Sequence, residues 1–314
     1  MRFVPSRGDV SMEPAQSLQL LILGIALGSV YALIALGYSM VYGVLRLINF
    51  AHGDIIMVGA FVGYFIAKAT FTELLPLPLR LAFVFIGAML ACAALGVAIE
   101  RCAYRPIRNQ PRLTALITAI GVSLLLEYGG QVVLGATPRQ DLPEWLTSQT
   151  PLLSLGSVQV RDKQLLVLGG SLLLLALMRF IVFNTMIGKA MRAVSHDLTA
   201  AYLVGINVNR VIAMTFAIGS ALAAAAGVMM AMSYPKIDPL MGLMPGIKAF
   251  VAAVLGGIGD LPGAVLGGFV LGLAETFVGY FASGLRDAVA FAILILILLF
   301  KPTGLLGKGM VEKV

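Results

Sequence analysis

Residues 14–45 read PAQSLQLLILGIALGSVYALIALGYSMVYGVL and carry no charged side chain, with Glu13 and Arg46 flanking them. About 20 consecutive apolar residues are enough for a helix to cross a lipid bilayer. The core of a cleaved signal peptide has only about 7–15 apolar residues, and the apolar run from Leu18 to Leu45 is clearly longer. The stretch therefore predicts a membrane-spanning helix that is retained in the protein.

The composition of the whole chain agrees with a membrane protein. Hydrophobic residues make up 60% and charged residues 12% of its 314 residues, whereas an ordinary soluble domain has about 25% charged residues. The apolar runs do not alternate with polar residues, as the strands of an outer-membrane barrel would. We therefore predict an all-α polytopic membrane protein. The net charge of +7 then reflects basic cytoplasmic loops rather than binding of nucleic acid.

Apolar runs follow one another along the chain, at residues 18–45, 55–67, 81–99, 113–134, 164–183, 211–234, 247–258, 263–282 and 288–300. The runs at 55–67 and 247–258 are too short for an ordinary crossing. They point to broken or re-entrant helices, because irregular backbone at membrane depth is tolerated only where it lines a cavity or is buried in protein. We expect eight or nine membrane-spanning segments, depending on whether residues 247–258 cross.

Basic residues near the spans predict the orientation, because Lys and Arg are enriched in cytoplasmic loops. The segments 101–112 and 179–210 each contain four basic residues, and two apolar runs separate them, so both are placed in the cytoplasm. The sequence leaves open whether Met1 or Met12 is the first residue. The predicted organisation is an external tail at 1–16, a transmembrane domain at 17–300 with an external loop at 135–163 and a cytoplasmic loop at 188–210, and a cytoplasmic tail at 301–314.

A polar segment, RLINFAHGD at residues 46–54, follows the first run. Ionisable side chains at membrane depth usually face a bundle interior or water, and they are functional candidates for that reason. The segment is predicted to form the break before the second membrane element, although a solvated cytoplasmic turn is the alternative. Its candidates for a path through the bundle are Asn49, Phe50, His52, Gly53 and Asp54.

Two acids lie deeper in apolar runs, Glu127 and Glu275. Without basic or His partners at helical spacing they would make a poor proton relay. They are predicted to be hydrogen-bonded groups that face the bundle interior, and Glu275 is a further candidate for the path.

No constellation for catalysis, metal binding or a cofactor is present in the sequence. The two histidines, His52 and His196, lie in separate segments, and Cys92 and Cys102 have no metal or redox spacing. A nucleotide-binding P-loop would read Gly-x4-Gly-Lys-Ser/Thr, and no segment matches it. We therefore expect neither an enzyme nor a bound metal or cofactor, and any ATP energy must come from a partner.

The loop GKAMRAVSHDLTAAYLVGINVNR at 188–210 has apolar residues at helical spacing. It is either an amphipathic helix that lies on the bilayer surface or a docking helix for a cytoplasmic partner. Its segment AAYLVG, residues 200–205, resembles the Ala-Ala-x3-Gly core of the cytoplasmic loop of ATP-binding-cassette (ABC) importer permeases. Thr199 stands where many of those permeases carry Glu, and their later Ile-x-Leu-Pro is absent.

Longer segments resemble the branched-chain amino-acid importer permeases, and above all the H-type subunit of the leucine/isoleucine/valine system. They are residues 28–60, 99–108, 192–228, 246–268 and 302–307. The resemblance implies a permease of the bacterial inner membrane that forms the path for Leu, Ile and Val. It also implies four kinds of partner: a second, M-type permease, two cytoplasmic ATPase subunits, a periplasmic substrate-binding protein and membrane lipid.

In such permeases the stretch equivalent to residues 192–205 is a coupling helix held by an ATPase subunit. The resemblance implies polar contacts from Arg192 and Asp197, and close packing at Ala200, Ala201 and Gly205. Urea, amides or other amino acids are alternative substrates in the same family. An ion-coupled secondary transporter is a rival class, but it would not need a docking loop, and a membrane-embedded enzyme ranks last.

Overall fold

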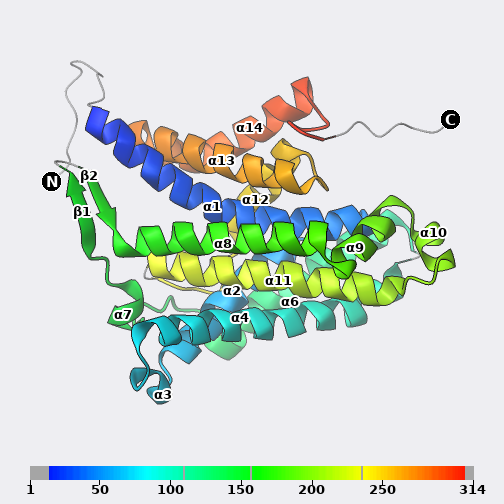
Figure 1. The fold of residues 1–314 in the computed structure, drawn as a ribbon, viewed down its shortest axis with the longest axis horizontal. Helices are drawn as coiled ribbons and strands as arrows, with labels where there is room; N and C mark the ends of the chain where they lie inside the picture. The colour runs from blue at the N-terminus through cyan, green and yellow to red at the C-terminus, as the bar shows by residue number, and fades with distance from the viewer. Residues whose placement is uncertain (1–13, 109, 156–157, 235, 308–314) are drawn as a thin grey trace.

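The computed structural model describes residues 14–108, 110–155, 158–234 and 236–307, and these form a bundle of roughly aligned helices (Figure 1). Within these residues, seven helices are long and apolar enough to cross a membrane. They are α1 (Pro14–Leu45), α4 (Leu77–Ile99) with its helical continuation to Ile107, α6 (Arg112–Leu134), α8 (Asp162–Asn184), α11 (Val208–Ser233), α13 (Leu261–Phe281), and α14 (Arg286–Phe300) with the turn from Ser283 that precedes it. The prediction of an all-α polytopic membrane protein is confirmed, whereas eight or nine crossings stay a prediction.

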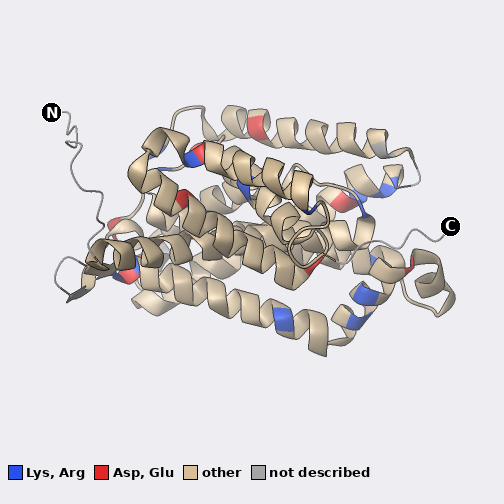
Figure 2. Cartoon of the chain, turned by 90° about the horizontal axis from the view of Figure 1, so that it is seen from above, with Lys and Arg blue, Asp and Glu red and all other residues tan. Residues whose placement is uncertain are grey.

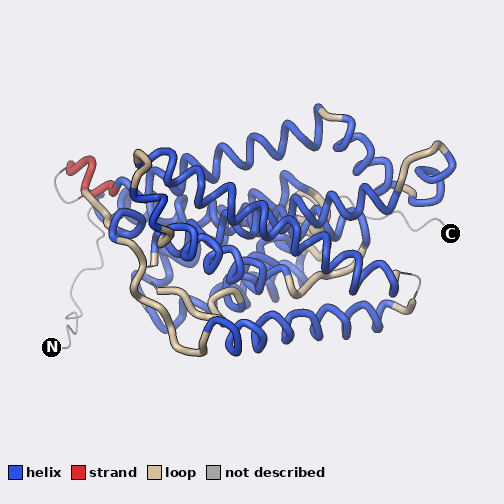
Figure 3. The backbone as a smooth tube through the Cα atoms, turned by 90° about the horizontal axis from the view of Figure 1, so that it is seen from below, coloured by secondary structure: helices blue, strands red, loops and turns tan. Residues whose placement is uncertain are grey.

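The remaining elements are shorter. They are α2 (His52–Ala67), α3 (Thr70–Glu73), the π-helical η1 (Glu100–Tyr104), α5 (Arg105–Ile107), α7 (Glu144–Thr147), β1 (Pro151–Leu155), β2 (Val158–Arg161), α9 (Met186–His196), α10 (Leu198–Leu203), α12 (Leu243–Gly256) and the 3-10 turn η2 (Ser283–Leu285). The strands β1 and β2 form an antiparallel hairpin that the sequence did not predict. Figure 3 shows this hairpin at one end of an otherwise helical chain.

The two short apolar helices, α2 and α12, are the segments expected to be broken or re-entrant. Their N-terminal turns touch inside the bundle. A Cβ atom on Gly53 would lie 3.0 Å from the carbonyl oxygen of Gly242 and 3.2 Å from the Cα of Gly246. Only glycines allow the two backbones to approach this closely, so the polar segment 46–54 is held against the start of α12.

Small residues also join the long helices. Gly268 and Gly272 of α13 lie against the backbone of α1 at Ala32 and Gly28. These small-x3-small spacings let two helices pack with their backbones in contact. Such close van der Waals packing helps to hold helices together in a membrane, where lipid tails are as apolar as the side chains and the hydrophobic effect does not favour association. The pair α1–α13 is the most extensive helix contact of the fold.

The basic segments meet at one end of the bundle. Arg108 donates a hydrogen bond to Asn209 at 2.7 Å, and Arg46 donates to the carbonyl of Ser195 at 3.4 Å. Lys and Arg gather at this end, which carries α9 and α10, while the hairpin lies at the opposite end (Figures 1 and 2). The arrangement fits two basic segments on one face of a membrane, and the assignment of that face to the cytoplasm stays a prediction. Most of the predicted tail 1–16 and half of the tail 301–314 lie outside the described residues.

Candidate functional site

The segment 46–54 turns the chain from α1 into α2. Arg46 has a left-handed backbone, with φ of 56°, and α2 begins six residues later at His52. Asn49 accepts a hydrogen bond from the Tyr104 hydroxyl at 2.8 Å. The ring of His52 packs edge-on against Tyr38, with their centroids 4.5 Å apart.

Three polar side chains of this segment are buried rather than solvated, whereas Arg46 at its start is exposed. Asn49, His52 and Asp54 are each at most 2% exposed. The alternative of a solvated turn therefore does not describe them. Asn49 and His52 pack against neighbouring helices, whereas Phe50, Gly53 and Asp54 line a cavity.

That cavity has a volume of about 290 Å³ and lies between α1, α2, α6 and α12. Two carboxyl groups reach it, from Asp54 in the first turn of α2 and from Glu127 of α6. Asp54 accepts a short hydrogen bond from the Ser123 hydroxyl, one turn before Glu127 on α6. The rest of the lining is largely apolar: Tyr38, Phe50, Ile120, Leu124, Leu243, Ile247 and Phe250. Glu127 thus joins the predicted path residues, and a sequence gives no hint that α6 faces α2.

Glu275 does not line this cavity and belongs to a separate buried network. Its carboxylate accepts hydrogen bonds from the Tyr31 hydroxyl and from Nζ of Lys248, both at 2.8 Å. Lys248 also contacts Asp287 at 2.7 Å. The expectation that Glu275 is a hydrogen-bonded interior group is met, but its basic partner was missed. The position of Lys248 inside the apolar run 247–258 could have indicated a buried acidic partner, because ionisable residues in membrane segments usually pair with one another.

Glu100 is a buried acid that sequence reasoning missed. It is fully buried and pairs with Arg105 at 2.7 Å and Arg108 at 3.1 Å. Arginines near the membrane were interpreted only as markers of orientation. Both pairs lie within the continuous α4–η1–α5 stretch, and Arg108 also ties its end to Asn209 of α11.

The loop 188–210 contains two helices, so the expected single helix over 192–205 is wrong. Asp197 breaks it, with an extended backbone (φ −154°, ψ 113°) between α9 and α10. Its carboxylate accepts hydrogen bonds from the backbone N–H groups of Ala200 and Thr199, which lower the pKa of Asp197. Asp is a preferred N-cap because it satisfies N–H groups that a helix start leaves free.

Gly205 ends α10. Its φ is +84°, its N–H bonds to the carbonyl of Tyr202, and the N–H of Ile206 bonds to the carbonyl of Ala201. This pair of bonds is a Schellman cap, in which glycine takes the left-handed position at no steric cost. A Cβ atom on Gly205 would meet no atom within 4 Å, so the chain itself needs this glycine for its backbone angle and not for space.

Arg192 is bound within the chain. Its guanidinium donates to the carbonyl of Val182 at the end of α8 and lies 5.4 Å from the ring centre of Phe183. It therefore ties α9 to α8. A polar contact from Arg192 or Asp197 to a partner remains a prediction, and each side chain also has this internal role.

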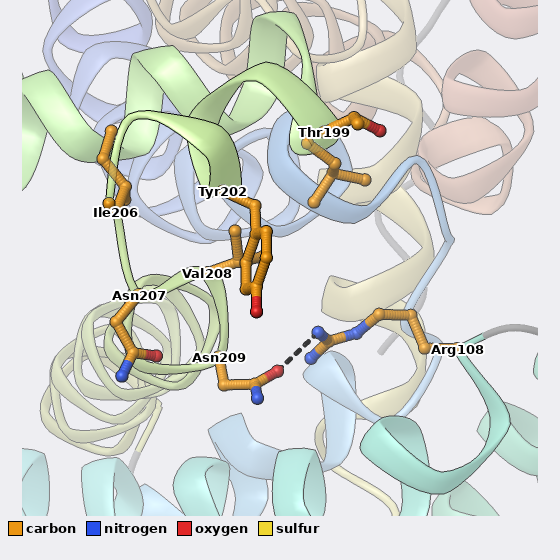
Figure 4. A pocket seen from close by; sticks show the side chains of 9 residues that line it. Arg108, Thr199, Tyr202, Ile206, Asn207, Val208 and Asn209 are labelled. Carbon is orange, nitrogen blue, oxygen red and sulfur yellow. Dashed lines mark hydrogen bonds between the residues drawn. The ribbon is translucent and has the colours of Figure 1, made fainter.

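An open groove of about 800 Å³ lies beside α10 (Figure 4). Tyr202 of α10, the first residues of α11 and Arg108 surround it, and Arg108 is bonded to Asn209. The apolar side chains of Tyr202, Leu203 and Val204 are 73–79% exposed. Ala200 is exposed, whereas Ala201 is buried against the chain. The tip of α10 thus offers an apolar surface next to a groove with polar edges.

Long apolar helices around two short internal ones, with a largely apolar cavity that two carboxyl groups reach, define a polytopic α-helical membrane protein. The chain matches a family model described as "Branched-chain amino acid transport system / permease component" over residues 20–298. This chain belongs to that family.

Two relatives extend over nearly the whole chain. The high-affinity branched-chain amino acid transport system permease protein LivH of Salmonella typhimurium is 46% identical over 303 residues, which are 95% of this chain and 97% of the relative. The corresponding protein BraD of Pseudomonas aeruginosa is 43% identical over 302 residues, which are 95% of this chain and 98% of the relative. A solved structure, PsaBC from Streptococcus pneumoniae in complex with Fab, covers 91% of this chain with a TM-score of 0.48 and 16% identity.

Proposed function

We propose that this chain is a permease subunit of an ATP-driven importer and forms part of the path for leucine, isoleucine and valine across the bacterial inner membrane. The observation that carries the proposal is the exposed apolar tip of α10 at the basic end of the bundle. A self-sufficient carrier has no use for such a surface, whereas exposed apolar patches commonly mark contacts with other proteins. The names of the two relatives support the substrate class.

The exposed surfaces of the chain suggest where each proposed partner would bind. Two cytoplasmic ATPase subunits would bind the importer, one of them at α10 and the groove beside it. A second, M-type permease would cover part of the apolar faces of α6 and α14, whose spans are only 11% buried. A periplasmic substrate-binding protein would deliver substrate at the opposite end, where the β1–β2 hairpin lies.

We place the substrate path at the cavity between α2, α6 and α12. Phe50, Gly53 and Asp54 line it, and we assign them to the path. Asn49 and His52 would stabilise the break between α1 and α2, next to this cavity. Glu275 would act on the path only through the packing of α12 and α13, because it lies outside this cavity.

The proposal predicts that import depends on ATP and on the partners. Proteoliposomes with this chain, the second permease and both ATPase subunits should accumulate radiolabelled leucine when the binding protein is outside and the ATPase subunits have access to ATP. Omission of ATP should reduce uptake to the level of empty liposomes, because the chain has no nucleotide-binding segment of its own. Uptake by this chain alone, driven by a proton or sodium gradient, would contradict the proposal, and a preference for urea or an amide over leucine would correct the substrate.

The cap of α10 provides a second prediction. Gly205→Leu should reduce co-purification of the ATPase subunits and leucine uptake several-fold, because a non-glycine residue in the left-handed region costs about 1–2 kcal/mol and unravels the end of α10. Gly205→Asn should keep most of both activities, since Asn tolerates this conformation.

The two variants separate the possible reasons for the glycine. An equal loss in Gly205→Asn would mean that a partner's backbone comes close to this position. Normal assembly and uptake in Gly205→Leu would mean that the loop is only a surface connector, and α10 would have no part in docking.

A further inference from the structure

The cavity between α2, α6 and α12 is lined by two buried carboxyl groups without a matching cation. Asp54 is 2% exposed and Glu127 is 8% exposed. Among the described residues, no Lys or Arg forms an ion pair with either carboxyl group, in contrast to Glu100 and Glu275. Buried carboxylates are costly unless a cation or several hydrogen bonds compensate them. Ser123 provides one such hydrogen bond to Asp54. A positively charged group could reach the two carboxyl groups through the cavity.

The remaining walls favour an aliphatic group. Ile120, Leu124 and Phe250 line the cavity together with Phe50 and Ile247. Its volume of about 290 Å³ is at the low end of the roughly 300–1,000 Å³ found for small-molecule pockets. The combination of apolar walls and a few convergent polar groups is typical of such pockets, and the size suits one amino acid.

The ends of two helices add partial positive charge to the same cavity. The N-terminal turns of α2 and α12 reach the cavity through Gly53 and Gly246. The N-terminal ends of helices carry partial positive charge, and broken helices in transporters direct such ends at anionic substrate groups. One cavity therefore offers negative charge, partial positive charge and apolar walls, the three features that a zwitterionic amino acid with an aliphatic side chain would need.

We propose that Asp54 and Glu127 bind the α-ammonium group of the transported amino acid, with its side chain against Ile120, Leu124 and Phe250. This inference rests on the proposed function and specifies a binding site within it. The two acids would keep the amino group in the path after the binding protein has released the substrate. The site would accept several aliphatic side chains and reject molecules that lack a cationic amino group.

The test removes the charge while keeping the shape of each side chain. Asp54→Asn, Glu127→Gln and the double variant are reconstituted with the partners, and uptake of radiolabelled leucine is measured. The double variant should lose uptake about tenfold or more, because it removes both charged partners of the ammonium group from a desolvated site. Asp54→Glu and Glu127→Asp retain the charge and should recover part of the uptake. Glu73→Gln removes an exposed acid and serves as the matched control.

A second measurement reports on binding without requiring transport. Photo-leucine, a diazirine analogue of leucine, is added to the assembled wild-type complex and illuminated, and labelled peptides are identified by mass spectrometry. Peptides of α6 and α12 should be labelled in the wild type and lose most of the label in the double variant. Co-purification of the partners checks that each variant has assembled.

The outcomes distinguish the site from the function. Wild-type uptake of the double variant would overturn the inference and leave the importer proposal intact. Lost uptake with unchanged labelling of α6 and α12 would also overturn it, since the two acids would then act only through structure. If the wild type imports no leucine, the importer proposal fails, and the labelling experiment still decides whether the cavity binds an amino acid.

Discussion

Gly272→Leu is expected to prevent the chain from folding into a stable, purifiable protein. A Cβ atom on Gly272 would overlap the backbone of Gly28, and α1 cannot move away without losing its long contact with α13. Overpacking a core costs about 1–3 kcal/mol and occasionally more. Here the obstacle is backbone rather than a flexible side chain, so the loss in the free energy of unfolding should be at the upper end of that range.

The measurement is the yield and thermal midpoint of the detergent-purified protein. Gly169→Leu on α8 is the matched control, because a Cβ atom at Gly169 would meet no atom within 4 Å. It makes the same substitution inside a long apolar helix and should leave yield and midpoint near the wild-type values. Similar behaviour of the two variants would contradict the close packing of α1 on α13.

Much of the helical framework could be predicted from the apolar runs alone. The six longer runs became long helices, and the short runs at 55–67 and 247–258 became the short helices α2 and α12. The equally short run at 288–300 is part of a candidate span only together with the turn before it, as Ser283–Phe300. The reason is physical: in a bilayer every backbone polar group must be satisfied within the segment, so an apolar run has few structures available. The hairpin of β1 and β2 was not predicted because it lies in the loop 135–163, where water can satisfy the backbone and this restriction does not apply.

The loop 188–210 illustrates where periodicity misleads. Met191, Val194, Leu198 and Ala201 keep helical spacing across a break, so the pattern predicted one helix where there are two. The signal that was available is Asp197, a residue that favours caps over helix interiors. Close packing of a partner at Gly205 stays a prediction, and the structure adds that this glycine ends α10.

The candidate site was predicted only in part for a different reason. Asp54 could be found because it stands in a polar segment of an apolar chain. Glu127 could not be joined to it, since the two residues are on helices whose contact depends on the folded structure. The same holds for Glu275, whose partner Lys248 is 27 positions away on another helix. A sequence shows which charged residues lie within apolar runs, but it does not show which of them are in contact in the folded protein.

The network around Glu275 leads to the second prediction of large effect. Lys248→Met should lower the free energy of unfolding by about 3 kcal/mol, the low end of the range for breaking a buried ion pair. Among the described residues, Glu275 would then keep only the half-exposed Arg286, 3.6 Å away, as a cationic partner. Both side chains are buried, at 5% and 4% exposure for Lys248 and Glu275. Asp287→Asn is the milder control, since its side chain is 55% exposed and surface pairs contribute only about 0–1 kcal/mol.

A double variant separates charge from packing. Lys248→Met combined with Glu275→Gln leaves no buried charge, and the amide can still accept the hydrogen bond from Tyr31. Replacing both members of a buried pair is often close to neutral, so the double variant should be more stable than Lys248→Met alone. Thermal unfolding of the purified variants measures this difference. If the double variant were instead the less stable of the two, Lys248 would stabilise α12 through its packed side chain, and Glu275 would have no need of a cation.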